Sequence, residues 1–256
     1  MYDDLKSNPQ IRLLVDSGAF TAWKTGRHFS LDDYCKALDH AQKRIPIWRY
    51  FTLDVIGDAD GTRRNYDELK RRGYDPIPIF TRGAAQADLE YYYERTELVG
   101  VGGLVGTTGS RGFVNGIMRC VGSRAVHLLG FTRFDFMKHY RPYSCDSSNF
   151  NRGGKYGWVD IYVGAGHMPH LMRTTVKHGN ISSAIASTLH RYGFDPWSLG
   201  RPSGWTGKDA PAVKIPYFSW VDFSLDAERN IGTKVFLACS PADLSTMLQA
   251  YERVHL

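Results

Sequence analysis

Two runs, Arg49-Tyr-Phe-Thr-Leu-Asp54 and Asp75-Pro-Ile-Pro-Ile-Phe80, decide the fold together with the helical pattern between them. Both runs are short and rich in apolar and aromatic residues, which is typical of strands. The pattern over Asn65 to Arg72 predicts a helix, and Gly73 is a usual residue just past a helix end. A strand, a helix and a second strand with short connections predict parallel strands with a right-handed crossover.

The same alternation extends in both directions along the first 150 residues. Ser30-Leu-Asp-Asp33 is a start signal for one of the helices, because a serine followed three residues later by an acid can satisfy free amides. Further strands are expected at Ile11–Asp16, Leu98–Gly103, Ala125–Phe131 and Tyr143–Asp146, and further helices at Leu31–Arg44, Gln86–Thr96 and Asn115–Val121. Such units build a closed barrel or an open sheet. We expect an α/β fold of the TIM-like (β/α) barrel type, because polar candidates follow several strands, and in a barrel these strand ends share one rim.

The remaining residues are organised differently. Asn151-Arg-Gly-Gly-Lys-Tyr-Gly157 is a basic connector, and Asp195 to Pro211 is rich in Gly, Pro and Trp. Helices are expected at Ser182–Arg191 and after Ser240-Pro-Ala-Asp243, and strands at Trp158–Val163, Ala212–Trp220 and Lys234–Cys239. We expect one domain over residues 1–256, in which 1–150 carry the motifs and 151–256 complete the barrel and face the nucleic acid. The barrel is either closed in a rearranged way or incomplete.

Bulk composition narrows the class of protein. Hydrophobic residues make up 43% of the chain and aromatic residues 13%, which indicates a folded globular protein. No run of 18 apolar residues and no signal peptide is present, so we expect a soluble protein of the cytoplasm that does not enter a membrane. The net charge of +6 suits a partner that carries phosphates.

Cysteine and histidine usage argues against a metal site. The four cysteines form no CxxC pair, and they are expected to be reduced thiols. His167-Met-Pro-His170 is the one close pair of histidines, and no third ligand accompanies it. We therefore expect neither a metal nor another cofactor.

Two acidic residues lie where an apolar strand gives way to small polar residues. Asp16 is found in Leu13-Leu-Val-Asp-Ser-Gly-Ala-Phe20, and Asp146 in Pro142-Tyr-Ser-Cys-Asp-Ser-Ser-Asn-Phe150. A single Asp after a strand more often caps a helix or orders a turn. A pair of carboxylates at strand ends is what glycosidic-bond chemistry requires.

Six motifs in order resemble the tRNA-guanine transglycosylase superfamily, most closely its shorter phage-type relatives that place 7-deazaguanine bases in DNA. The resemblance covers roughly residues 11 to 160. The motifs are Val15-Asp-Ser-Gly-Ala-Phe20, Phe51-Thr-Leu-Asp-Val-Ile-Gly57, Pro76-Ile-Pro-Ile-Phe-Thr-Arg-Gly83, Val99-Gly-Val-Gly-Gly-Leu-Val-Gly106, His127-Leu-Leu-Gly130 and Tyr143-Ser-Cys-Asp-Ser-Ser148.

The resemblance implies a division of labour between the carboxylates. Asp146 corresponds to the nucleophile that attacks C1′ of the target nucleotide, and Asp16 to the general acid/base that serves the leaving and entering bases. A carboxylate can capture an oxocarbenium-like sugar as a covalent intermediate while a second carboxyl protonates the departing purine.

The resemblance also implies a base-binding set. Asp54 corresponds to the acid that accepts hydrogen bonds from N1–H and the 2-amino group of a guanine-like base; its alternative role is a turn cap. Ser17 either holds the base or caps the following turn. The other members are Thr81 and Arg82, which contact the base or a phosphate, and Gly102, Gly103 and Leu104, whose backbone approaches the base edge.

The chain departs from the tRNA-acting enzymes because their zinc subdomain is missing after Asp146. The expected partners are therefore DNA, in preference to tRNA, and a free 7-deazaguanine such as preQ0; if a phage encodes the chain, it acts in the host cytoplasm. A homodimer is a further expectation, because a protein of this size has little surface with which to grip a duplex. The alternatives are a tRNA-guanine transglycosylase, a barrel glycoside hydrolase with the same carboxylates, and a binding module without chemistry.

Overall fold

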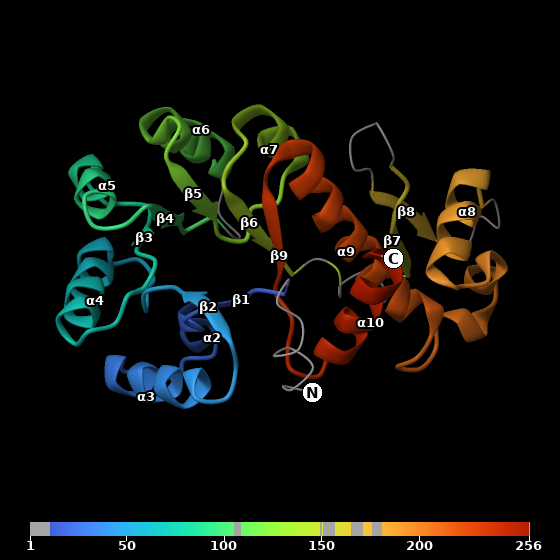
Figure 1. The fold of residues 1–256 in the computed structure, drawn as a ribbon, viewed down its shortest axis with the longest axis horizontal. Helices are drawn as coiled ribbons and strands as arrows, with labels where there is room; N and C mark the ends of the chain where they lie inside the picture. The colour runs from blue at the N-terminus through green and yellow to red at the C-terminus, as the bar shows by residue number, and fades with distance from the viewer. Residues whose placement is uncertain are drawn as a thin grey trace. The chain divides into compact units, whose positions relative to one another are not determined.

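The computed structural model describes residues 11–104, 109–148, 150, 157–164, 171–175 (backbone only) and 181–255 (Figure 1). By internal contacts the chain divides into two compact units, Met1–Gly130 and Phe131–Leu256. Both units mix helices and strands, so the predicted α/β class is confirmed.

The first unit alternates strands and helices in the predicted way. Its elements are β1 (Leu13–Val15), α2 (Ala19–Lys24), α3 (Leu31–Gln42), β2 (Ile47–Tyr50), α4 (Ala59–Arg71), β3 (Ile79–Phe80), α5 (Gln86–Tyr93), β4 (Leu98–Val101), α6 (Ser110–Val121) and β5 (Ala125–Leu128).

Strand pairing in this unit is parallel and follows the order of the sequence. β1 pairs with β2, and β3, β4 and β5 pair in turn. An isolated parallel bridge between Phe51 and Ile77 links the segment after β2 to the one before β3. The strand order therefore runs from β1 to β5 without the reversal that defines a doubly wound sheet.

The second unit contains the remaining elements. They are α7 (Phe134–Tyr140), β6 (Ser144–Ser147), β7 (Trp158–Tyr162), β8 (Leu171–Thr175), α8 (Ser183–Tyr192), the short 3-10 helices η4 (Pro196–Gly200) and η5 (Pro202–Gly204), α9 (Pro211–Ile231), β9 (Lys234–Leu237) and α10 (Leu244–His255). β6 and β9 are parallel, whereas β7 and β8 are antiparallel. The largest sheet has five strands in the order β3-β4-β5-β6-β9, and the pairings of the described residues include none that closes it into a barrel.

Several helices begin where side chains cap them. Ser30 accepts a hydrogen bond from the Asp33 amide (3.1 Å), as its sequence pattern predicts, and Ser182 accepts one from the Ile185 amide (3.3 Å). Asp58 accepts a bond from the Gly61 amide at 2.8 Å, so α4 begins six residues before the predicted start at Asn65.

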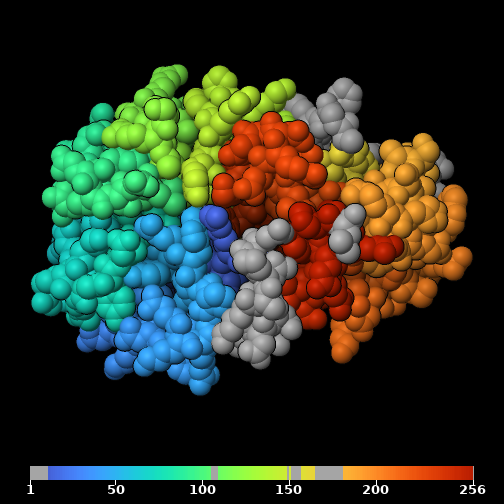
Figure 2. All heavy atoms as spheres, viewed as in Figure 1, coloured from blue at the N-terminus to red at the C-terminus, as the bar shows by residue number. Residues whose placement is uncertain are grey.

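The helices of the first unit cover one face of its strands. Tyr34, Cys35 and Leu38 of α3 belong to a buried cluster with Tyr50 of β2 and Leu69 of α4. In the space-filling view these helices, coloured blue to green, form much of the visible surface of the unit (Figure 2). Asp16 and Thr81 are assigned to the opposite face of the strands, as described below.

The strand predicted at Ala212–Trp220 is wrong, because these residues belong to α9. Pro211 occupies the first turn of that helix, where a missing amide proton costs little. Ala212, Ile215 and Phe218 are all buried, and a continuous apolar run of this kind does not distinguish a strand from a buried helix. The predicted pair His167 and His170 lies outside the described residues, as does the connector from 151 to 156.

Candidate functional site

Eight of the nine predicted site residues belong to the first unit and follow the ends of its strands. Asp16 and Ser17 come directly after β1, and Asp54 comes four residues after the end of β2. The others are Thr81 and Arg82, after β3, and Gly102, Gly103 and Leu104, after β4. Because these strands are parallel neighbours, their carboxyl ends lie at the same edge.

Ser17 and Asp54 are in direct contact although 37 positions separate them in the sequence. The Ser17 hydroxyl donates to Asp54 Oδ1 at 3.0 Å and accepts a bond from the Ala19 amide at 3.3 Å. Ser17 therefore performs the turn-capping role considered for it and also holds the carboxylate. Asp54 does not cap the next helix, because Asp58 fills that position.

Burial governs the ionisation of Asp54. The carboxyl is half-buried, and desolvation raises its pKa above the ordinary value, against the opposing effect of the Ser17 hydrogen bond. Asp16 is exposed by comparison. The two carboxyls differ in environment, which is the usual way to give paired acids separate roles.

Tyr34 is a buried neighbour that the sequence patterns did not single out. Its hydroxyl, on α3, donates to the carbonyl of Phe51, just past β2. Burial raises the pKa of Tyr34 strongly, and the charges of Asp16 and Asp54 raise it further. Tyr34 therefore keeps its proton and anchors the strand end that leads to Asp54. A tyrosine on the apolar side of a helix looks like core, so no pattern marks it.

Arg82 spans the loop after β4. Its Nε donates to the Gly103 carbonyl at 3.1 Å, and its guanidinium carbon lies 4.9 Å from the centre of the Phe113 ring. A terminal nitrogen also reaches Ser110 Oγ at 3.5 Å, and that hydroxyl donates to the Leu104 carbonyl at 2.9 Å. The guanidinium is therefore engaged with the loop backbone that was predicted to approach the base.

The two glycines of this loop pack against β3 with no space for a side chain. A Cβ on Gly102 would lie 2.9 Å from Ile79 Cγ2, and one on Gly103 would lie 3.1 Å from Thr81 Oγ1. Gly103 also has a φ of +70°, which disfavours other residues. Thr81 thus faces the glycine backbone across the strand ends.

Alternation along the strands indicates which face carries these residues. Phe80 stacks with Phe113 of α6, so the next residue, Thr81, points to the face that this helix does not cover. Val15 packs against the α3 cluster, and Asp16 follows it. Asp16 and Thr81 are thus assigned to the strand face away from the helices, whereas the Arg82 guanidinium lies against Phe113 and Ser110 of α6.

Asp146 lies in the second unit, within β6. Its neighbour Cys145 is buried with its sulfur 3.9 Å from that of Met137 on α7, so alternation directs Asp146 to the opposite face of β6. The side chain of Asp146 is half-buried, and its carbonyl accepts a bond from Thr132 Oγ1 at 2.6 Å. The strand itself is held by β9, where Asp146 is opposite Phe236.

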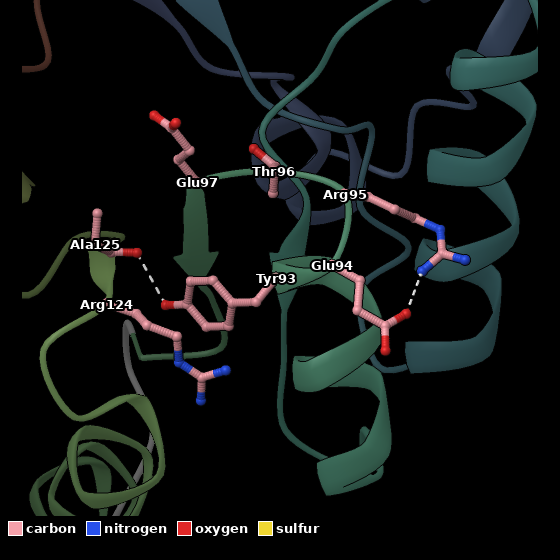
Figure 3. Close-up of a pocket in the computed structure, with 7 residues that line it drawn as sticks. All are labelled: Tyr93, Glu94, Arg95, Thr96, Glu97, Arg124 and Ala125. Carbon is pink, nitrogen blue, oxygen red and sulfur yellow. Dashed lines mark hydrogen bonds and ion pairs between the residues drawn. The ribbon is translucent and has the colours of Figure 1, made fainter.

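A surface pocket of the first unit lies away from these residues (Figure 3). Its lining consists of residues 93–97, before β4, together with Arg124 and Ala125 at the start of β5. It is therefore at the amino ends of the strands. The Tyr93 hydroxyl donates to the Ala125 carbonyl at 2.9 Å, and Arg95 pairs with Glu94 at 3.0 Å. Arg124 pairs with Glu90, outside the lining, at 2.6 Å, and we assign no ligand to this pocket.

Two searches of the described residues gave negative results. No three His, Cys, Asp or Glu side chains are grouped there as metal ligands. Within the same part of the chain, no helix combines the length and apolarity needed to cross a bilayer.

Comparison with known proteins found no matching family model, curated protein or solved structure.

Proposed function

We propose that the protein is a transglycosylase that exchanges guanine in DNA for a 7-deazaguanine base such as preQ0. The observation that carries the proposal is the Ser17–Asp54 contact at the end of adjacent parallel strands, directly beside Asp16. A held carboxylate next to a more exposed one provides separate groups for base recognition and proton transfer. The motif resemblance supplies the identity of the substrate.

We also propose that the strands form a (β/α) barrel. The order from β1 to β5 without reversal supports this, as does the position of Asp16 and Thr81 on the face away from the helices. In such a barrel the carboxyl ends of all strands surround one opening, which is where barrel enzymes assemble their sites.

The proposed reaction has two displacements at C1′. The Asp146 carboxylate attacks C1′ and the bond to guanine breaks, while Asp16 gives its proton to the departing base. The entering 7-deazaguanine then loses a proton to Asp16 and attacks C1′, which breaks the ester to Asp146. Two inversions restore the original configuration.

Asp54 selects the base in this scheme. Its carboxylate accepts hydrogen bonds from N1–H and the 2-amino group, a donor pair that guanine and 7-deazaguanines share. Ser17 fixes the carboxylate through Oδ1, so its orientation is set before the base binds. Target guanine leaves the stack to reach this edge, because C1′ and the glycosidic nitrogen are poorly accessible inside a duplex.

The covalent intermediate provides the direct test. Wild-type protein incubated with guanine-containing DNA is expected to give a protein–DNA band on a denaturing gel, and Asp146→Asn is expected to give none. An adduct that persists in the Asn variant would show that Asp146 is the wrong nucleophile.

The polymer and the reaction type are tested with labelled 7-deazaguanine. Label is expected to enter duplex DNA in the presence of wild-type protein and to be absent from tRNA. Label in tRNA alone would favour the tRNA-acting alternative. Release of sugar or base without an added base would favour the glycoside hydrolase.

A further inference from the structure

The segment that follows Asp16 and Ser17 exposes two aromatic rings. Phe20 and Trp23, both on α2, have 42% and 60% of their surface exposed, and their ring centres are 5.9 Å apart. Large apolar side chains are normally covered, so adjacent exposed rings point to a partner surface.

The same segment carries positive charge that is not compensated. Residues 17–31 contain no Asp or Glu, and Lys24 and Arg27 are exposed. Within the described part of the chain neither cation has an ion pair. Some other arginines of the unit do have acidic partners: Arg72 pairs with Asp32 at 2.6 Å, and Arg124 with Glu90 at 2.6 Å.

We infer that Phe20, Trp23, Lys24 and Arg27, here called the α2 surface, bind the unpaired DNA strand beside the target guanine. Exposed rings offer a stacking platform for bases of any sequence, and adjacent cations face the phosphates. Base faces become available only in an opened or single strand, which suits rings better than a closed duplex does. The inference rests on the proposed function for the identity of the polymer.

The position of the α2 surface supports this role. Phe20 is four residues after Asp16, so a nucleotide on these rings lies next to the proposed acid/base. A protein partner could cover the two rings, but only an acidic one would supply carboxylates to pair with Lys24 and Arg27. A DNA strand satisfies the rings and the cations together.

The stacking part is tested with Trp23→Ala and a short single-stranded oligodeoxynucleotide. Fluorescence anisotropy is expected to show binding weakened by about 5- to 100-fold, the range that loss of one stacked base produces. Trp23→Phe is the matched control, because it keeps an aromatic ring at the same position. Its affinity is expected to stay close to that of wild type.

The charge part is tested with the double variant Lys24→Ala/Arg27→Ala. The slope of log affinity against log salt is expected to fall by about 1.4, since each phosphate contact with a single strand contributes about 0.7. Lys43→Ala/Arg44→Ala is the control with the same charge change. These two exposed residues follow α3 and precede β2, at the amino ends of the strands.

The outcomes separate this inference from the proposed function. The α2 surface is overturned if wild-type protein binds no DNA strand or binds only RNA. It is also overturned if Trp23→Ala loses as little affinity as Trp23→Phe. If base exchange still occurs in that case, the proposed function survives. If the variants weaken DNA binding as expected while wild type exchanges no base, the α2 surface stands and the proposed function fails.

Discussion

At the scale of single residues, the site depends on a short polar side chain that performs two tasks. The Ser17 hydroxyl accepts a hydrogen bond from the Ala19 amide in the turn into α2 and donates one to Asp54. The backbone therefore holds the hydroxyl that orients the Asp54 carboxylate. Burial raises the pKa of Asp54, whereas hydrogen bonds from the Ser17 hydroxyl and from its own backbone amide lower it. The net direction is upward, and it has a measurable consequence.

Asp54→Asn is expected to make the folded protein more resistant to urea at pH 7. A carboxyl with a raised folded-state pKa contributes most stability below its ordinary pKa of 3.8, and this contribution is lost as the pH rises through the raised value. Above that raised value the wild type bears an ionised, half-buried group that Asn lacks. The difference between the two proteins should shrink toward pH 3. Lower urea resistance of the variant at pH 7 would mean that the Ser17 bond outweighs burial.

Arg82→Lys tests whether Arg82 positions the loop or binds a phosphate. Because Nε and a terminal nitrogen contact Gly103 and Ser110, we expect the KM for the free base to rise by roughly 10- to 100-fold, the cost of losing a charged hydrogen bond. The affinity for DNA and its salt dependence are expected to stay unchanged. A reduced salt slope with an unchanged KM would instead identify a phosphate contact.

At the scale of elements, the contact between α3 and the end of β2 stabilises the segment that leads to Asp54. The Tyr34 hydroxyl is buried and satisfies the Phe51 carbonyl, while Phe51 itself contacts the ring of His127 on β5 at 4.9 Å between centres. Tyr34 thus connects α3 to the end of β2, and Phe51 connects the end of β2 to β5.

Tyr34→Phe is expected to lower the free energy of unfolding by about 1–3 kcal/mol, because it leaves a buried carbonyl without its donor. Urea denaturation followed by circular dichroism measures the change. Tyr74→Phe is the matched control, since its hydroxyl donates to Asp39 at 2.9 Å in an exposed position and should contribute much less. Equal losses in the two variants would contradict the anchoring role of Tyr34.

At the scale of the whole molecule, the sequence predicts what local patterns determine. The parallel βα order and the Ser30 cap are confirmed, because apolar periodicity and capping chemistry are local. The sequence pattern could not show that Ala212–Trp220 is helical. Residues on several sides of this helix are buried, so its apolar residues do not follow the 3.6-residue period of an amphipathic helix. The helix α2 has only six residues and begins after Gly18, which adopts a left-handed conformation and has no side chain to cap the helix, so the sequence pattern does not mark it.

Contacts between distant residues were also beyond the sequence patterns. The motif positions predicted Ser17 and Asp54 separately, but their hydrogen bond follows from the pairing of β1 with β2. Arg82 was predicted to contact the base or a phosphate, and its engagement with Gly103 depends on the register of β3 and β4. The pairing of distant strands therefore determines which candidate residues contact one another.

The four cysteines provide a test of burial across the molecule. Burial raises the pKa of Cys145 to about 12, so at pH 8 only about one molecule in ten thousand has this thiol ionised. Maleimide labelling followed by peptide mass spectrometry is expected to modify the partly exposed Cys120 long before Cys145. Denaturant should make both react alike. Rapid labelling of Cys145 in the folded protein would contradict the buried position of the strand that carries Asp146.

The segments that leave β1, β2, β3 and β4 each carry their own candidate residues, and the proposed base-binding residues all lie outside the paired strands. This separation has an evolutionary consequence. Under the proposed function, substitutions in the segment after β2 are expected to alter base preference without changing any strand pair, and changes in α2 are expected to alter the polymer independently of the base. Scaffold, base preference and polymer preference would then be able to change separately.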